Sequence, residues 1–135
     1  MTDLTTGSCL CGAVEFQISG DFEKFFLCHC SRCRKATGSA HAANLFSSTA
    51  TLTWLSGEDR IKTFKVAGTR FEKSFCMECG SALPGVRDNG AGMMVPAGSL
   101  DSSVSIRPNA HIFCESRADW DDHLERVQQL DCRPG

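Results

Sequence analysis

Seven of the nine cysteines in this 135-residue chain are grouped at spacings typical of metal ligands, and this grouping constrains the fold more than any other feature. They form three clusters, at residues 9–11, 28–33 and 76–79. A structural zinc has four protein ligands, whereas a catalytic zinc typically has three and leaves one position open. Two clusters of two thiols can complete one tetrahedral shell, so the remaining cluster of three thiols is a candidate for an open site.

The two outer clusters predict a structural zinc held by Cys9, Cys11, Cys76 and Cys79. The segment from Cys76 to Cys79 has the spacing of a zinc knuckle, in which two thiolates on a tight turn grip one ion. Gly80 follows directly and can take the positive φ that brings the backbone close to sulfur. Cys9 and Cys11 are two positions apart, so on an extended segment both side chains project to the same side.

The middle cluster predicts a second zinc, held by Cys28, Cys30 and Cys33, which lie within six residues. Three thiolates around Zn²⁺ leave a position that a water or an external thiol can take. Zinc lowers the pKa of a bound thiol, so the incoming thiol is held as its nucleophilic thiolate. Three cationic residues that could contact an anionic ligand lie in or just after this cluster: Arg32, Arg34 and Lys35.

Other interpretations of the middle cluster stay open at this stage. The fourth ligand could come from the chain itself, from one of four residues: His29, His41, His111 or Cys114. An iron–sulfur cluster or a redox pair of two of the thiols is a further alternative. We expect the His29 ring to point away from the metal, Cys114 to be a buried strand residue and Cys132 to have no role.

The composition indicates an ordinary globular chain, with 41% hydrophobic and 22% charged residues. The net charge of −2 gives no reason to expect nucleic acid or an anionic membrane as a partner. No apolar run approaches the roughly 20 residues that span a bilayer, and the polar N-terminus contains an acidic residue. We therefore expect one domain over residues 1–135 in the cytoplasm, where thiols stay reduced.

The periodicity predicts a mainly β fold of several short antiparallel sheets, pinned by the structural zinc, with one or two short helices. Val14, Phe16 and Ile18 alternate with polar residues, which is typical of a half-buried strand. Further strands are predicted at residues 42–46, 52–55, 61–66, 70–76 and 111–114. The middle cysteine cluster is expected on a loop, followed by a glycine-rich turn region at 85–92 later in the chain. Helices are predicted at residues 31–37, closed by Gly38, and at 121–130.

Five stretches of the sequence carry a resemblance to a known family: Gly7-Ser8-Cys9-Leu10-Cys11-Gly12-Ala13-Val14, Cys28-His29-Cys30-Ser31-Arg32-Cys33-Arg34-Lys35-Ala36-Thr37-Gly38, Phe75-Cys76-Met77-Glu78-Cys79-Gly80, Pro96-Ala97-Gly98-Ser99-Leu100-Asp101 and His111-Ile112-Phe113. They resemble the glutathione-dependent formaldehyde-activating enzymes, a family that includes the centromere protein V-like proteins. The match extends over nearly the whole chain, and its ordered cysteine clusters are specific.

The resemblance implies a compact, mostly β fold with two zincs per chain. The four outer thiols would be the structural ligands, and Cys28, Cys30 and Cys33 would hold the catalytic zinc, whose open position accepts the glutathione thiol. The implied reaction adds that thiol to formaldehyde or a related carbonyl and gives an S-hydroxymethyl adduct, which is carbon–sulfur lyase chemistry in reverse. Two alternatives from other classes are a non-catalytic zinc-stabilised protein-binding module and a metal or redox sensor.

Overall fold

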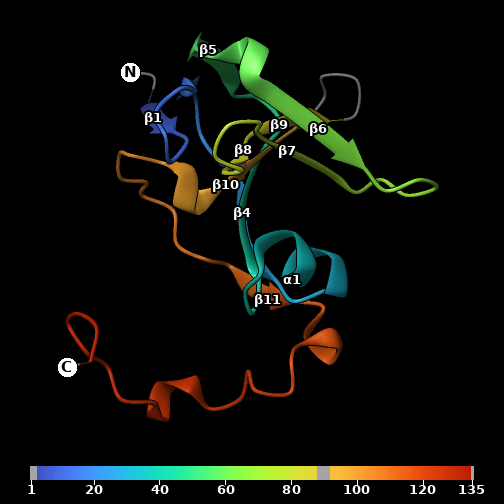
Figure 1. Ribbon diagram of the computed structural model, residues 1–135, viewed down its shortest axis with the longest axis vertical. Coiled ribbons are helices and arrows are strands. Elements are labelled where there is room, and N and C mark those ends of the chain that lie inside the picture. The colour runs from blue at the N-terminus through green and yellow to red at the C-terminus, as the bar shows by residue number, and fades with distance from the viewer. Residues whose placement is uncertain (1–2, 88–91, 135) are drawn as a thin grey trace.

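The computed structural model describes residues 3–87 and 92–134, and most of its regular structure is β-strand (Figure 1). The strands are β1 (Leu4–Ser8), β2 (Glu15–Ser19), β3 (Lys24–Cys28), β4 (Ala42–Ser47), β5 (Thr51–Ser56), β6 (Ile61–Lys65), β7 (Glu72–Cys76), β8 (Ala82–Leu83), β9 (Gly85–Arg87), β10 (Gly92–Pro96) and β11 (Ala110–Ile112). The helical elements are α1 (Ser31–Thr37) and the 3₁₀ turns η1 (Glu58–Arg60), η3 (Ala97–Ser99), η4 (Cys114–Ser116) and η5 (Leu124–Arg126). The predicted mainly β class is confirmed, with one α-helix in the described part of the chain.

The strands form three small sheets. The first has the order β1-β2-β5, the second β11-β3-β4-β10-β9 and the third β6-β7-β8. All pairings are antiparallel except that of β11 with β3, which is parallel. The second sheet is therefore mixed, because the last strand returns to the sheet edge through a long connection instead of a hairpin.

The larger of the two hydrophobic clusters among the described residues lies where the first and second sheets meet. Phe16 and Ile18 alternate on β2 with exposed or half-buried residues, and Val14 just before the strand is buried with them. Leu45 of β4 and Val95 of β10 are also fully buried and belong to the same cluster. The alternation predicted around β2 is confirmed. One face of the second sheet thus packs in the core, and its other face is free to line a binding site.

The helix α1 begins and ends where the sequence predicts. Cys30 caps its N-terminus, since its sulfur accepts a hydrogen bond from the Cys33 amide at 3.4 Å. Gly38 closes it in the left-handed conformation, φ 66°, and its amide donates to Arg34 O at 2.8 Å. The middle cysteine cluster was expected on a loop that leads into the helix, and Cys33 lies in α1 as predicted, but Cys28 ends strand β3. The cluster is therefore held at a strand-to-helix junction.

The predicted strands are present, and the structure adds β1, β3, β8 and β10, which were not predicted. β1 places the polar Thr5 inward, β3 leads into the cysteine cluster, β8 has two residues, and β10 is a continuous run of buried residues without alternation. The strand predicted at 111–114 is β11, which ends at Ile112. The region predicted as a turn at 85–92 begins with β9 and ends at the start of β10, and residues 88–91 of it lie outside the described part.

The helix predicted at residues 121–130 is wrong. This segment is irregular apart from η5, and Figure 1 shows it extending along one end of the molecule. Leu124, Val127 and Leu130, whose helical spacing supported this prediction, are 44%, 59% and 51% exposed. A helix of ten residues is marginal in water unless tertiary packing supports one face. This face has no such support.

Candidate functional site

The four outer thiols come together in space as one group. Their sulfur atoms all lie within 4.8 Å of one another. Cys11 Sγ is 3.6 Å from Cys9 Sγ and 3.9 Å from Cys76 Sγ. A tetrahedral zinc with Zn–S bonds of about 2.3 Å requires sulfur pairs about 3.8 Å apart. The donor set therefore fits a closed zinc site.

Backbone and hydroxyl groups fix the orientation of these thiols. The Val14 amide donates to Cys9 Sγ at 3.3 Å. Ser81 Oγ accepts a hydrogen bond from the Leu10 amide at 2.9 Å and lies 3.2 Å from Cys79 Sγ, so it joins the two halves of the site. Gly80 has φ 77° and its amide donates to Cys76 O at 2.8 Å, which forms the tight turn predicted for the knuckle.

The thiols of this group differ widely in acidity. The contact with Ser81 is the largest of several hydrogen bonds that lower the pKa of Cys79 to about 5. The Ala13 amide favours the Cys11 thiolate, but the adjacent Cys9 thiol and the other sulfurs outweigh it and raise the pKa of Cys11 to about 11. Thiols that compete in this way for protons are all ionised together only when a cation binds them.

The three middle thiols form a second group, whose sulfurs also lie within 4.8 Å of one another. Cys28 and Cys33 are buried and Cys30 is half-buried. Burial, as the largest effect, raises the pKa of Cys28 and of Cys33. Burial acts in the same direction on Cys30, but the Cys33 amide leads the hydrogen bonds that outweigh it and lower the pKa of Cys30. Among the described residues, no fourth side chain joins this group. Three soft donors with one side unprotected fit an open zinc site.

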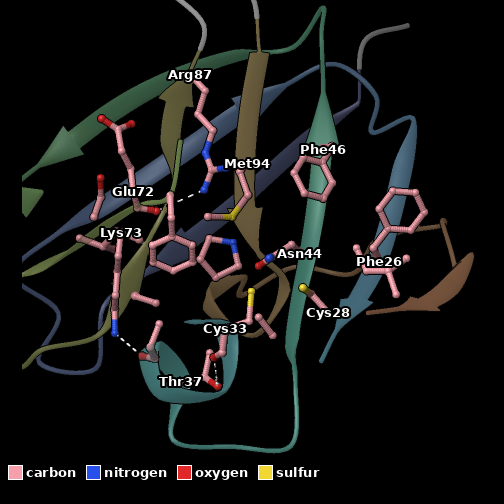
Figure 2. A pocket seen from close by; sticks show the side chains of 18 of the residues that line it. Phe26, Cys28, Cys33, Thr37, Asn44, Phe46, Glu72, Lys73, Arg87 and Met94 are labelled. Atoms are coloured by element: carbon pink, nitrogen blue, oxygen red, sulfur yellow. Dashed lines mark hydrogen bonds between the residues drawn. The ribbon is translucent and has the colours of Figure 1, made fainter. Parts of the chain in front are cut away.

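A cavity of about 230 Å³ lies directly against Cys28 and Cys33 (Figure 2). Its floor is the face of the second sheet that points away from the core. Strand alternation places every second residue on this face, and the register aligns Cys28 with Ala42 and Phe26 with Asn44. The neighbouring pairings complete the floor with four further residues: Phe46, Met94, Pro96 and Ile112.

The cavity is covered by α1 and by the third sheet. Ala36 and Thr37 of α1 line it beside Cys33, and Phe71 lines it together with residues 72–74 of the following strand β7. Lys73 Nζ donates to Ala36 O and thereby ties β7 to the end of α1. The lining is mostly apolar, so Cys28 and Cys33 border a largely hydrophobic space.

A family model described as "Glutathione-dependent formaldehyde-activating enzyme" matches residues 4–116, which include all seven clustered cysteines. The chain belongs to this family. A protein of Halomonas elongata, provisionally named as an enzyme of this type, is 33% identical over 139 residues that cover 98% of this chain and 88% of the relative. A crystal structure of a Rhodobacter sphaeroides protein shares the fold, with a TM-score of 0.57 and 22% identity over 78% of this chain and 98% of the other.

Two cationic residues of the cavity in this family member were not singled out by sequence. They are Arg87 of β9 and Lys73 of β7, which both line the cavity. Arg87 Nη2 donates to the backbone oxygen of Glu72, the residue before Lys73, at 3.2 Å. The three cations predicted to contact a ligand, Arg32, Arg34 and Lys35, are absent from the lining as the structure describes it. No sequence signal distinguished Lys73 and Arg87, because the pairing of the sheets decides which cations reach the cavity.

Asn44 is the second feature that the sequence analysis missed. It lies in the middle of β4, between Ala42 and Phe46 on the cavity face, and Figure 2 shows its amide near the Cys28 and Cys33 sulfurs. A polar amide on an otherwise apolar strand face is the signal that could have identified it. An amide here has N–H donors available for an oxygen atom of a bound molecule.

Three of the four histidines form a cluster of their own next to the middle thiols. His29 Nε2 is 2.8 Å from His111 Nδ1, and His29 Nδ1 is 3.0 Å from Asp121 Oδ2. The His41 ring lies 5.1 Å from that of His29. The His29 ring is engaged by these partners and is not part of the three-thiol group. Asp121 thus ties the C-terminal segment to the junction between β3 and α1.

The two remaining cysteines lie outside both groups. Cys114 was expected to be a buried strand residue, but it is exposed in η4, because β11 ends two residues earlier. Cys132 is exposed in the C-terminal segment. All nine cysteines are free thiols. Separately, none of the helices in the described residues has the length and apolar character required to cross a bilayer.

Proposed function

We propose that this chain catalyses the addition of the glutathione thiol to formaldehyde or a related carbonyl, giving an S-hydroxymethyl adduct. In the reaction the sulfur bonds to the carbonyl carbon, the C=O π bond breaks, and the thiol proton ends on the oxygen. The family and the relative's name support the choice of thiol and carbonyl. In reverse the same step is a carbon–sulfur lyase reaction.

The observation that carries this proposal is that the three-thiol group is incomplete as a structural metal site and borders a cavity. Its sulfurs fit a metal, no fourth side chain of the described residues completes it, and two of its members line a cavity. A purely structural site is closed by protein ligands. An open position beside a sheltered cavity is instead what a reaction at a metal requires.

We assign the structural zinc to Cys9, Cys11, Cys76 and Cys79, and the second zinc to Cys28, Cys30 and Cys33. The chemistry that zinc supplies at a site with an open position is ionisation of an external thiol at neutral pH. The three thiols would hold that ion at the junction of β3 and α1. The buried Cys28 and Cys33 would keep the reacting atoms on the cavity side.

The other cavity residues would bind and orient the two substrates. Asn44 would donate a hydrogen bond to the carbonyl oxygen, where negative charge develops as the sulfur attacks. Lys73 and Arg87 would attract the carboxylates of glutathione, since an Arg fork suits that geometry. The apolar walls would exclude water and strengthen these polar contacts.

The direct test follows exchange between formaldehyde and glutathione by NMR, with protein loaded with zinc. We expect the adduct to form and dissociate faster than in the spontaneous reaction. The matched control is Cys132→Ser, which removes an exposed thiol outside both groups and should behave as the wild type. No acceleration with both metal sites filled would contradict the proposal.

A zinc-stabilised binding module is the second candidate. The feature that favours it is the exposed apolar C-terminal segment, in which Trp120 is 60% exposed and Val127 59%. Large exposed apolar side chains close together are typical of interaction surfaces. Lack of catalysis, together with full metal occupancy and a stable fold, would favour this function.

A further inference from the structure

Phe113 occupies a position where neither the backbone nor the core favours a phenylalanine. Its backbone is in the left-handed region, at φ 57° and ψ 42°. This region suits glycine and, among other residues, asparagine, aspartate and histidine, whereas a bulky aromatic residue there is an outlier. The side chain is also 60% exposed, so packing in the core does not offset the strain. A residue that conflicts with its local conformation in this way is expected at a functional position.

The lining of the cavity explains this conformation. Ile112 is the last residue of β11, and the parallel register aligns it with Cys28. Successive residues of a strand point to opposite faces of the sheet, so a continued strand would direct Phe113 away from the cavity. Ile112 and Phe113 nevertheless both line it. The left-handed turn at Phe113 thus ends the alternation and keeps the ring on the cavity side, beside Cys28.

Contacts on both sides hold Phe113 in this conformation. Before it, the His29 amide donates to Ile112 O at 2.9 Å. After it, the Ser116 amide donates to Phe113 O at 3.1 Å, and Asp121 Oδ2 lies 3.0 Å from His29 Nδ1. A strained residue persists only when its surroundings fix it in this way. Both anchors lead to His29, which lies between two thiols of the three-thiol group.

We propose that Phe113 is a positioning residue for the thiol substrate, and that its ring packs on the bound molecule at the edge of the cavity beside Cys28. This inference rests on the proposed function and adds a residue to it. A thiol compound whose sulfur reaches the three thiols brings its own methylene group to this edge. Ring surface that is exposed in the free chain would then be buried, at a gain in affinity.

A glycine variant separates the ring from the strain. Phe113→Gly removes the ring and accepts the left-handed φ, so we expect an unfolding midpoint equal to or above that of the wild type. We expect it to bind glutathione about tenfold or more weakly, because the apolar contact is lost. The affinity is measured by calorimetry with the zinc-loaded chain and no aldehyde. An unchanged affinity would overturn the proposal.

A tyrosine variant checks that the ring itself carries the effect. Phe113→Tyr keeps the ring and adds a hydroxyl that solvent can accommodate, since the side chain is 60% exposed. It should bind glutathione within about twofold of the wild type. If tyrosine weakens binding as much as glycine does, the ring does not position the thiol and the proposal fails.

His123→Gly is the matched control. Among the described residues, His123 is the other one besides glycine with a positive φ, 53°, and it is outside the cavity lining. Its substitution changes the backbone in the same way without altering the cavity, so the affinity for glutathione should equal that of the wild type. Equal losses in both glycine variants would attribute the effect to backbone freedom and overturn the proposal.

Turnover separates this inference from the proposed function. With glutathione and formaldehyde, Phe113→Gly should raise the KM for glutathione about tenfold and change kcat by less than about threefold, since the lost contact is made before the reaction. Acceleration by the wild type together with an unchanged KM in the variant would overturn the role of Phe113 and leave the proposed function intact. Absence of acceleration by the wild type would contradict the proposed function, and calorimetry would still decide whether Phe113 contacts the thiol compound.

Discussion

The two cysteine groups of this chain share the same donor atoms and differ in what surrounds them. The four-thiol group lies against the hydrophobic core, to which Cys9 and Cys76 belong. It joins segments that are more than sixty positions apart, and such a link removes much of the conformational entropy of the unfolded chain. The three-thiol group comes from six consecutive residues and lies against a cavity. A metal in the first group would stabilise the fold, and one in the second would face a ligand.

Replacing a thiol of the four-thiol group should have the largest effect. In Cys76→Ser a fully buried ligand is lost, and structural zinc contributes on the order of 10 kcal/mol to folding. This is comparable to the whole stability of a domain of this size. We expect the variant to be unfolded at 25 °C, as measured by circular dichroism and thermal scanning. Native-like unfolding behaviour would show that the group does not pin the fold.

Replacing a thiol of the three-thiol group should remove activity and leave the fold intact. Cys30→Ser is the sharpest choice, because serine is a favoured N-cap and keeps the cap of α1 while it removes the ligand. We expect one zinc per chain in place of two, exchange at the spontaneous rate and an unfolding midpoint close to that of the wild type. If Cys30→Ser and Cys76→Ser behave alike, the division between the two groups is wrong.

Substitutions of Asn44 test whether the cavity beside the three-thiol group takes part in the reaction. Loss of one preorganised donor to a developing oxyanion typically costs about 10²-fold or more in kcat. We expect Asn44→Ala to lower kcat by about that factor, with little change in the KM for glutathione. Asn44→Asp has the same shape without N–H donors and should be as impaired as Asn44→Ala. If the aspartate variant keeps its activity, Asn44 only fills space.

The smallest effect is on the pH dependence of stability and concerns His41, in the cluster of His29, His41 and His111 next to the three-thiol group. Burial, followed by the charges of His29 and His111, lowers the pKa of His41, against an opposing effect of Asp121. The unfolded chain then binds more protons than the folded one once the pH falls below about 6.5, so stability is lost in that range. His41→Gln should flatten this acid limb in urea unfolding between pH 7.5 and 5.5. The exposed His123→Gln should leave it unchanged.

Local sequence predicted α1 and the turn between Cys76 and Gly80, for a common physical reason. The cap residues Cys30 and Gly38 fix the ends of α1 through contacts within one or two turns. The turn at Gly80 similarly depends on a hydrogen bond to Cys76, four residues earlier. Features of this kind are encoded in neighbouring residues, so spacing alone predicts them.

The C-terminal segment shows where local periodicity fails. Leu124, Val127 and Leu130 have helical spacing, but no surface of the described residues buries them. Asp121, at the start of the same segment, is instead paired with His29. Helical spacing predicts a helix only when a partner face is available, and that depends on the rest of the fold.

The sequence by itself determined the grouping within each cysteine cluster, because ligands two or three positions apart have little freedom in where they point, whereas the folded chain brings Cys9 and Cys11 to Cys76 and Cys79. Only the tertiary structure decided that one group faces the core and the other a cavity. The cavity needs β3, β4 and β10 side by side, with α1 and β7 above them, and these strands are far apart in the chain. Asn44, Lys73 and Arg87 line one cavity with Cys28 and Cys33 through that pairing, and no local pattern specifies it.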